Sequence, residues 1–251
     1  MKSIYWSVDL IPDQKGRIAL VTGANSGLGF QTAKALVKKN ATVLLCSRSI
    51  EKAEKAAFII RKETNSGTID LIKLDLSDLN EVNSVSDYIL TKYEKLDLLI
   101  NNAGLMAPPL SYSKQGFELQ FAVNHLSHMA LTLKLLPLIS RQKLGRVITV
   151  TSGAQYLGKI NIIELYEIKK YDRWSFYSQS KLANTMFALE LHERCRAFNI
   201  NVASLSAHPG LARTNLQSSS VEANNSWQEG IIYRLINPLF QNSYMGALPQ
   251  L

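Results

Sequence analysis

Cysteines and long apolar runs are scarce in this sequence. Only two cysteines occur, Cys46 in a predicted strand and Cys195 in a predicted helix, which indicates packed thiols in a reducing compartment rather than a disulfide framework. Residues 1–10 contain no apolar run long enough for a signal peptide, and no segment reaches the roughly eighteen apolar residues of a membrane span. These absences predict a cytoplasmic protein without a transmembrane segment.

Dense basic clusters are also missing, although the net charge is +8. Such an excess of positive charge could indicate binding to nucleic acid or to an acidic membrane surface. The lysines and arginines are instead spread along the predicted helix faces, without a cluster that includes aromatic residues. We therefore expect no nucleic-acid partner.

No linker, charge block or repeat divides the chain, so its 251 residues suit one α/β domain over residues 1–251. Apolar runs rich in β-branched residues alternate with amphipathic stretches. This alternation predicts a doubly wound parallel sheet with helices on both faces, the Rossmann fold. The predicted strands are 18–22, 42–46, 69–74, 96–101, 146–151 and 201–205, and the predicted helices are 28–39, 51–63, 79–93, 117–141 and 177–198.

A glycine-rich turn, TGANSGLG at residues 22–29, joins the first predicted strand to the first predicted helix. Its glycines allow a tight turn, a close approach of a pyrophosphate to the backbone, and packing of the helix on the strand. The N–H groups at a helix N-terminus then bind phosphate. A plain strand-to-helix turn is the alternative reading. The residues expected to contact the phosphates are Gly23, Asn25, Ser26, Gly27, Leu28 and Gly29.

The second predicted strand ends in Ser47 and Arg48. Chains that bind NAD usually carry Asp or Glu here, which accepts a hydrogen bond from the ribose 2′-hydroxyl. A neutral residue followed by a cation fits a 2′-phosphate instead, and so favours NADP(H) over NAD(H). The alternative is that Arg48 is an exposed side chain without a partner.

The third and fourth predicted strands also end in candidate cofactor-binding residues. Asp75, followed by Leu76, could accept a hydrogen bond from an adenine amino group, or it could cap the next helix, with Ser77 and Asp78 as rival caps. The fourth strand ends in Asn101-Asn102-Ala103-Gly104, which is small and polar where the backbone must approach a flat ring.

A candidate acid–base pair lies near the start of the last long helix. Tyr177 and Lys181 have i, i+4 spacing and share a helix face, and Ser152 follows the fifth strand. Lowering a phenol pKa by roughly three units takes about 4 kcal/mol, which a nearby Lys⁺ and an oxidised nicotinamide could supply together. We therefore expect a lowered Tyr177 pKa and carbonyl–alcohol chemistry.

The pattern Y-x-x-x-K occurs three times, at Tyr88, Tyr166 and Tyr177. The first lies on a helix that precedes a strand, at the wrong end of the sheet, and the second lies in a charged connection. Only the third follows a strand that ends in serine. Its position therefore selects Tyr177.

In order and spacing, these motifs resemble those of the short-chain dehydrogenase/reductases. The resemblance covers about residues 16–216 and rests on the glycine turn, residues 101–104, Asn124, Ser152, Tyr177 with Lys181, and Pro209-Gly210 with Thr214. The chain is most similar to the retinol-dehydrogenase-like and WW-domain-oxidoreductase-like branch. The marks of that branch are TGANSG, the long interval from Ser152 to Tyr177, SKLAN at residues 180–184, and HPG at residues 208–210.

The resemblance implies roles for the catalytic candidates. Tyr177 would exchange a proton with the substrate oxygen, and Ser152 would hydrogen-bond that oxygen. Lys181 would lower the phenol pKa and hold the nicotinamide ribose, while Asn124 would support a water relay from a break in its helix. Taken singly, Ser152 could instead cap the strand end and Asn124 could be a solvated helix residue.

The resemblance also bears on the cofactor and the substrate. Pro209, Gly210 and Thr214 would border the carboxamide and the diphosphate, although Pro209-Gly210 could be a simple turn. The substrate would be a small carbonyl or alcohol, with a retinoid, a steroid or a long-chain aldehyde as the analogy. A homodimer or homotetramer is implied as well.

Rival functions are a sugar-nucleotide epimerase or dehydratase, a non-catalytic dinucleotide sensor, and a truncated product of the same family. Epimerases and dehydratases carry a longer C-terminal lobe, and a sensor would be expected to lose Tyr177 or Lys181. Members of this branch usually continue beyond a segment such as residues 246–251 and add an edge strand. We therefore expect the C-terminal edge of the sheet to be incomplete.

Several aromatic and histidine residues have weaker signals. His125 and His128 have the i, i+3 spacing of two metal ligands, but a third ligand is not evident, so packed histidines without a metal are expected. His208 could touch cofactor or substrate, with packing as the alternative. Four aromatic residues could line an apolar pocket or belong to the core: Trp227, Tyr233, Phe240 and Tyr244.

Overall fold

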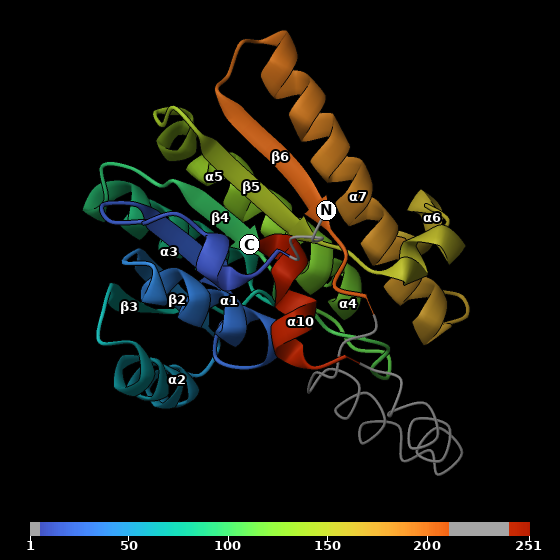
Figure 1. Cartoon of the computed structure of the whole chain (residues 1–251). Coiled ribbons are helices and arrows are strands. Elements are labelled where there is room, and N and C mark those ends of the chain that lie inside the picture. The colour runs from blue at the N-terminus through green and yellow to red at the C-terminus, as the bar shows by residue number, and fades with distance from the viewer. Residues whose placement is uncertain (1–5, 211–240) are drawn as a thin grey trace, which may run out of the picture.

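The computed structural model describes residues 6–210 and 241–251. Within them, one parallel sheet has the strand order β3-β2-β1-β4-β5-β6 (Figure 1). The chain order reverses between β1 and β4, which is the point of a doubly wound sheet where ligands bind beyond the carboxyl ends of the strands. The strands are β1 (Ile18–Thr22), β2 (Thr42–Ser47), β3 (Thr68–Lys73), β4 (Leu98–Asn101), β5 (Gly145–Val150) and β6 (Val202–Ala207).

Helices cover both faces of this sheet (Figure 1). The longer ones are α1 (Gly27–Lys38), α2 (Ile50–Thr64), α3 (Leu79–Lys92), α5 (Ser127–Ser140) and α7 (Arg173–Ala197). The short helices are α4 (Leu119–Phe121), α6 (Ile162–Tyr166) and α10 (Ser243–Ala247). Single turns lie at η1 (Val8–Leu10), η3 (Gly153–Leu157) and η5 (Leu248–Gln250), and the π-helical segment η2 (Ala122–Leu126) joins α4 to α5. The predicted doubly wound α/β fold is confirmed.

Two apolar layers form the core, because alternate side chains of a strand point to opposite faces of the sheet. On one face Val21 and Leu45 pack with Leu36 of α1 and with residues of α2. On the other face Leu20 and Leu44 pack with residues of α3, α5 and α7. Cys46 and Cys195 are buried free thiols, as the sequence predicts, and burial raises the pKa of both.

The last long helix begins earlier than the sequence predicts. The side chain of Asp172 accepts a hydrogen bond from the backbone N–H of Ser175 at 2.7 Å and so caps α7, whose first residue is Arg173. The prediction that this helix begins at Tyr177 was therefore wrong by one turn. Tyr177 therefore lies in the second turn of α7, with helical residues both before and after it.

The predicted helix over 117–141 is interrupted. It begins at Leu119 as α4, widens into the π-helical segment η2, and continues as α5. Asn124 lies in the middle of η2, so the break expected beside this residue is present. Short π-helical segments inside α-helices are frequent at functional sites.

The C-terminal segment packs beside α1 (Figure 1). Leu248 and Leu251 contact Val8, Ile11 and Ala35 in a small apolar cluster that joins the two ends of the described chain. Among the strands that the structure describes, β6 and β3 form the edges of the sheet.

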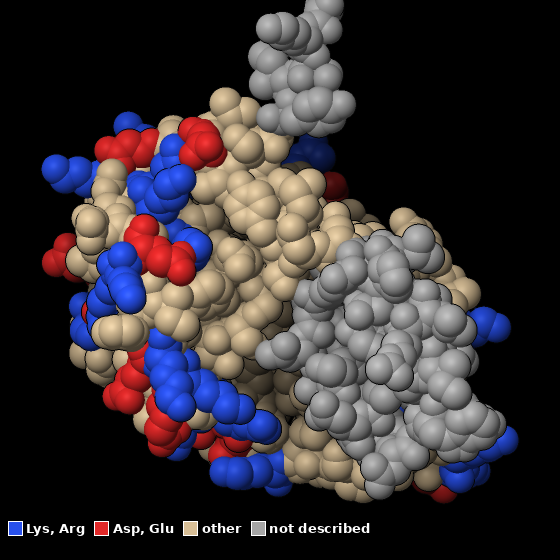
Figure 2. Space-filling model, turned by 60° about the horizontal axis from the view of Figure 1, so that its bottom comes forward, with Lys and Arg blue, Asp and Glu red and all other residues tan. Residues whose placement is uncertain are grey.

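Charged side chains are mixed in sign on the surface that Figure 2 shows. Lys and Arg are interspersed there with Asp and Glu, and no basic patch forms over the described residues of this face. Within residues 6–210 and 241–251, no helix has both the length and the apolarity that a membrane crossing requires.

Candidate active site

The glycine turn lies against the loop that follows β4. Gly23 has a φ of 65°, and a Cβ built on it would lie 3.0 Å from the Cα of Ala103. A Cβ on Gly29 would lie 2.5 Å from Nδ2 of Asn102. Because neither position has room for a side chain, only glycine allows the turn to pack this closely against the loop after β4.

Thr22 fastens that loop to the end of β1. Its Oγ1 accepts hydrogen bonds from the backbone N–H groups of Asn102 and Ala103, both at 2.9 Å. The side-chain amide of Asn102 donates back to the Thr22 carbonyl at 2.8 Å. The sequence motif included Thr22 but gave no sign that its hydroxyl organises residues 102–103.

Ser47 and Arg48 differ in their surroundings. Ser47 is buried, and its hydroxyl approaches Oδ1 of Asn25 at 3.1 Å and the Ser49 carbonyl at 3.0 Å, which ties the end of β2 to the glycine turn. Arg48 is exposed and makes no hydrogen bond or ion pair with any residue that the structure describes. Its guanidinium is therefore available at the rim beside the glycine turn.

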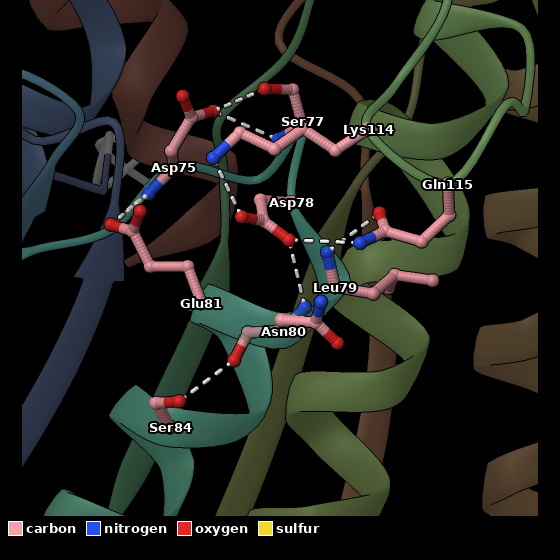
Figure 3. Close-up of polar contacts among 9 residues, drawn as sticks. All are labelled: Asp75, Ser77, Asp78, Leu79, Asn80, Glu81, Ser84, Lys114 and Gln115. Atoms are coloured by element: carbon pink, nitrogen blue, oxygen red, sulfur yellow. Dashed lines mark hydrogen bonds and ion pairs between the residues drawn. The ribbon is translucent and has the colours of Figure 1, made fainter.

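Asp78, rather than Asp75 or Ser77, caps α3 (Figure 3). The Asp78 carboxylate accepts from the Asn80 N–H at 3.0 Å, from Lys114 at 2.8 Å and from Gln115 at 2.9 Å. The hydrogen bond from Lys114 lowers the pKa of Asp78 to about 2. These contacts also hold the segment after β4 against the start of α3.

Asp75 therefore does not cap α3. One of its carboxylate oxygens, Oδ1, accepts from the N–H and hydroxyl of Ser77 at 2.9 and 2.7 Å, and Oδ2 has no hydrogen bond among the described residues (Figure 3). Leu76 is buried, and its carbonyl accepts from the Ser127 hydroxyl at 2.6 Å. Of the two readings for Asp75, helix capping is excluded.

Ser152, Tyr177 and Lys181 converge at the carboxyl end of β5. Tyr177 is 5% exposed. Its hydroxyl hydrogen-bonds with Ser152, which itself caps η3 by accepting from the Ala154 N–H at 3.3 Å. The Lys181 Nζ lies 5.8 Å from the centroid of the Tyr177 ring and donates to the Val150 carbonyl at 3.2 Å. Three residues from distant parts of the chain therefore meet beyond one strand end.

Burial dominates the ionisation of this cluster. It raises the pKa of Tyr177, and the hydrogen bond from Ser152 opposes the rise. It also lowers the pKa of Lys181 to about 8. The predicted lowering of the Tyr177 pKa requires a protonated Lys181 and an oxidised nicotinamide together, so it stays a prediction, whereas in the protein alone burial raises this pKa.

Asn124 connects the cluster to the loop after β4. Its Nδ2 donates to the Leu105 carbonyl at 3.0 Å and to the Ser180 hydroxyl at 2.9 Å, and its Oδ1 accepts from the Leu105 N–H at 2.7 Å. A Cβ built on Gly104 would lie 3.1 Å from Asn124 Oδ1 and 3.6 Å from Lys181 Nζ. A side chain at position 104 would therefore crowd Asn124, and Asn124 is buried rather than a solvated helix residue.

Residues 208–210 approach the same strand end. The Gly210 N–H donates to Nδ1 of His208 at 3.3 Å, and Nε2 of His208 lies 3.3 Å from where a Cβ on Gly153 would stand. The Pro209 carbonyl accepts from Gln241 at 2.5 Å. Tyr244 is 41% exposed. Thr214, Trp227, Tyr233 and Phe240 lie outside the described residues.

The remaining candidates lie outside the cluster of Ser152, Tyr177 and Lys181. Tyr88 is half exposed on α3, with Lys92 5.4 Å from its ring centroid, and Tyr166 is the last residue of α6. His125 Nδ1 contacts Asn184 at 3.2 Å, and His128 contacts Thr22 and Asn124. No group of three metal-ligating side chains occurs among the residues that the structure describes.

One polar contact, made by Gln250, could not be predicted from a sequence motif. Gln250 is buried, and its Nε2 donates to Thr32 at 2.5 Å and approaches Asn102 Oδ1 at 3.4 Å. The contact joins residues 218 positions apart in the chain, so sequence spacing gives no signal of it. Through it, the C-terminal segment reaches the loop that faces the glycine turn.

A glycine turn at the switch point of a parallel sheet, with a Ser, Tyr and Lys cluster beyond the neighbouring strand, defines a dinucleotide-dependent oxidoreductase of the α/β class. Residues 17–225 match the family described as short chain dehydrogenase. The chain belongs to the short-chain dehydrogenase/reductase family and to its retinol-dehydrogenase-like branch, whose members act on CH–OH donors.

Individual relatives agree with this assignment. Retinol dehydrogenase 12 of Mus musculus is 36% identical over 92% of this chain and 71% of its own length. The crystal structure of an uncharacterized protein from Mycobacterium paratuberculosis is 36% identical, covers 98% of this chain and 78% of its own, and superimposes with a TM-score of 0.76. A short-chain dehydrogenase from Sphingobium yanoikuyae in complex with NADPH has the same fold, with 17% identity, a TM-score of 0.70, and coverage of 92% of this chain and 81% of its own.

Proposed function

We propose that this protein is an NADP(H)-dependent oxidoreductase that interconverts a carbonyl compound and an alcohol. The observation that carries the proposal is the convergence of Ser152, Tyr177 and Lys181 at the edge of the sheet where the glycine turn lies.

The glycine turn at the N-terminus of α1 supports nucleotide binding. The Ser26 side chain makes no capping hydrogen bond there, so the N–H groups of this terminus would bind the diphosphate. The residues of the turn that would take part are Gly23, Asn25, Ser26, Gly27, Leu28 and Gly29. Asn102, Ala103 and Gly104 form the opposite wall and, with Lys181, would hold the nicotinamide and its ribose. Pro209 and Gly210, together with Thr214 from outside the described residues, would border the carboxamide and the diphosphate.

Arg48 supports the choice of NADP(H). Its guanidinium is exposed and unpaired within the described chain, and it follows Ser47, which is held to the glycine turn. No carboxylate follows β2 at this point to bind a ribose 2′-hydroxyl, whereas a guanidinium binds a 2′-phosphate with charge-assisted hydrogen bonds. Asp75 keeps an unpaired carboxylate oxygen that accepts from the adenine amino group.

Proton transfer falls to Tyr177. In reduction its hydroxyl gives a proton to the substrate oxygen, and in oxidation it takes one back, while Ser152 donates a hydrogen bond to the same oxygen. A bound nicotinamide supplies or accepts the hydride. Lys181 and the positive charge of an oxidised nicotinamide stabilise the phenolate against the effect of burial. Asn124 holds the backbone of Leu105 and the Ser180 hydroxyl, so that Lys181 keeps its place.

A lipophilic substrate fits the surroundings of Ser152. The segment that follows it exposes Tyr156, Leu157, Ile162 and Ile163, each at least 65% exposed. Apolar side chains this exposed near a candidate site are typical of a binding surface for an apolar molecule. With retinol dehydrogenases among the relatives, we propose a retinoid, a steroid or a long-chain aldehyde as the substrate class.

The test is to follow nicotinamide absorbance with the purified protein, NADPH or NADH, and a panel of aldehydes and ketones that includes retinal. Turnover with NADPH that is abolished in Tyr177→Phe supports the proposal. Turnover with NADH alone contradicts the role of Arg48. Nucleotide binding without turnover of any panel member favours a non-catalytic or truncated family member, and conversion of a nucleotide sugar favours an epimerase or dehydratase.

A further inference from the structure

His128 is a buried polar side chain that the proposed chemistry does not use. It lies in the first turn of α5, is 1% exposed, and stands between the glycine-turn strand and the π-helical segment η2. Its Nε2 contacts Thr22 Oγ1 at 2.9 Å, and its Nδ1 contacts the Asn124 carbonyl at 3.1 Å. Both nitrogens of this buried imidazole therefore have a hydrogen-bond partner, as buried polar groups generally do.

The hydrogen-bonding capacity of Thr22 fixes the direction of each bond. A hydroxyl has one hydrogen to donate and two lone pairs to accept with. The N–H groups of Asn102 and Ala103 occupy both lone pairs, so the Thr22 hydrogen must be donated. The available acceptors are Nε2 of His128 at 2.9 Å and the Ile100 carbonyl at 3.4 Å, and the shorter contact is favoured.

The other nitrogen of the ring agrees with this direction. A carbonyl can only accept, so Nδ1 carries the hydrogen and donates to Asn124. His128 is then the neutral tautomer with Nδ1–H and a bare Nε2. Burial lowers its pKa to about 4, which keeps this neutral form at ordinary pH.

We infer that His128 is a positioning residue, which sets the Thr22 hydroxyl so that the 102–103 loop faces the nucleotide, and which joins this loop to Asn124. The polar path runs from Thr22 through His128 to Asn124 and on to Ser180, next to Lys181. One side chain thereby couples the nucleotide wall to the helix that carries the proton-transfer residues. The part of this inference that concerns nucleotide affinity rests on the proposed function.

Loss of His128 has a defined consequence for Thr22. Without an acceptor at Nε2, the Thr22 hydrogen turns toward the Ile100 carbonyl, and the lone pairs turn away from Asn102 and Ala103. Leucine at position 128 fills the space but offers neither donor nor acceptor. Glutamine carries a donor NH₂ group and an acceptor oxygen at its end, so, like the neutral imidazole, it can both donate and accept.

The experiment compares His128→Leu, His128→Gln and a matched control, Leu135→Ala. Leu135 is a fully buried residue on α5, two turns from His128, and its substitution weakens packing without touching Thr22 or Asn124. Two quantities are measured, namely the dissociation constant for NADPH and the amide hydrogen exchange of residues 102–103 in the nucleotide-free protein. Circular dichroism verifies that each variant is folded.

We expect His128→Leu to weaken NADPH binding about tenfold, as befits one lost hydrogen bond with a partner left unpaired. The same variant should speed the exchange of the 102–103 amides. His128→Gln should recover most of both effects, and Leu135→Ala should show neither beyond its general loss of stability. In a Thr22→Val background, His128→Leu should add little, because its effect passes through the Thr22 hydroxyl.

Unchanged exchange at residues 102–103 in His128→Leu would overturn the inference, as would equal effects in Leu135→Ala. A wild-type protein that binds neither NADPH nor NADH would overturn the proposed function instead. Because hydrogen exchange is measured without nucleotide, it decides the positioning role of His128 in that case too.

Discussion

The ammonium of Lys181 lies 5.8 Å from the centroid of the Tyr177 ring and donates to the Val150 carbonyl at 3.2 Å. The two side chains belong to the same helix and are buried together at the end of β5. Burial lowers the pKa of the Lys181 amine and raises the pKa of the Tyr177 phenol. Both shifts disfavour charge in the protein alone. A bound group with positive charge would favour the phenolate, so the acid–base function depends on the nucleotide.

Tyr177→Phe should remove turnover while nucleotide binding is retained. The phenol is the proton-transferring group, and such groups contribute at least about a hundredfold to the rate. The measurement is kcat for reduction of the best panel aldehyde, with the NADPH dissociation constant as the control. A variant with wild-type kcat would show that Tyr177 does not transfer the proton.

Arg48→Ala should weaken NADPH binding by about tenfold or more and leave NADH binding nearly unchanged, because only NADPH carries a 2′-phosphate. The dissociation constants for the two nucleotides are measured in the same buffer at two salt concentrations. A matched control is Arg194→Ala, an exposed arginine on α7 that is paired with Glu190. If both nucleotides lose affinity equally, Arg48 does not read the 2′-phosphate.

Lys181 should make the nucleotide-free protein more stable as the pH rises from about 8 to about 10. Its pKa is about 8 in the folded chain, against about 10.4 for an unfolded lysine, so the unfolded chain binds more protons in this window. The free energy of unfolding therefore rises with pH there, and it does so less in Lys181→Met. Urea denaturation at several pH values measures the difference, and parallel pH profiles for the two proteins would contradict it.

Asp78→Ala should lower the melting temperature by a few degrees, because it removes the cap of α3 and the partner of Lys114 and Gln115. Asp78→Asn keeps a capping oxygen and should lose less. Since the folded pKa of Asp78 is about 2, below that of an unfolded aspartate, its contribution is present above about pH 4 and is lost as the pH falls toward 2. Differential scanning calorimetry at pH 7 and pH 3 measures the melting temperatures of the wild type and the variants. If the difference in melting temperature between wild type and Asp78→Ala is as large at pH 3 as at pH 7, the predicted pH dependence is wrong.

Motifs at strand ends could be predicted from the sequence because they depend on the order of residues within a short segment of the chain. The bounds of β1 were predicted without error, and the proximity of Ser152 to Tyr177 was expected from the resemblance to the family. Capping was harder, since Asp75, Ser77 and Asp78 are equivalent until the position of Lys114 is known. The start of α7 was missed because Asp172 was not considered as a cap.

Long-range polar contacts and burial could not be predicted. The contact between Thr22 and His128 joins residues 106 positions apart, and the sequence predicted only that this histidine is packed without a metal. The raised pKa of Tyr177 in the protein alone could not be predicted either, because the extent of burial depends on how all the surrounding elements pack. Such quantities belong to the tertiary structure rather than to any motif.

The widened turn at Ala122–Leu126 has a consequence for variation in chain length. Because its hydrogen bonds span five residues rather than four, this turn holds about one residue more than an α-helical turn, and removal of a single residue from it would leave a regular α-helix. Leu131, Leu135 and Leu138 of α5 would then keep their places in the core. A one-residue deletion within α5 itself would instead rotate every following side chain by about 100° and misalign an entire layer of the molecule.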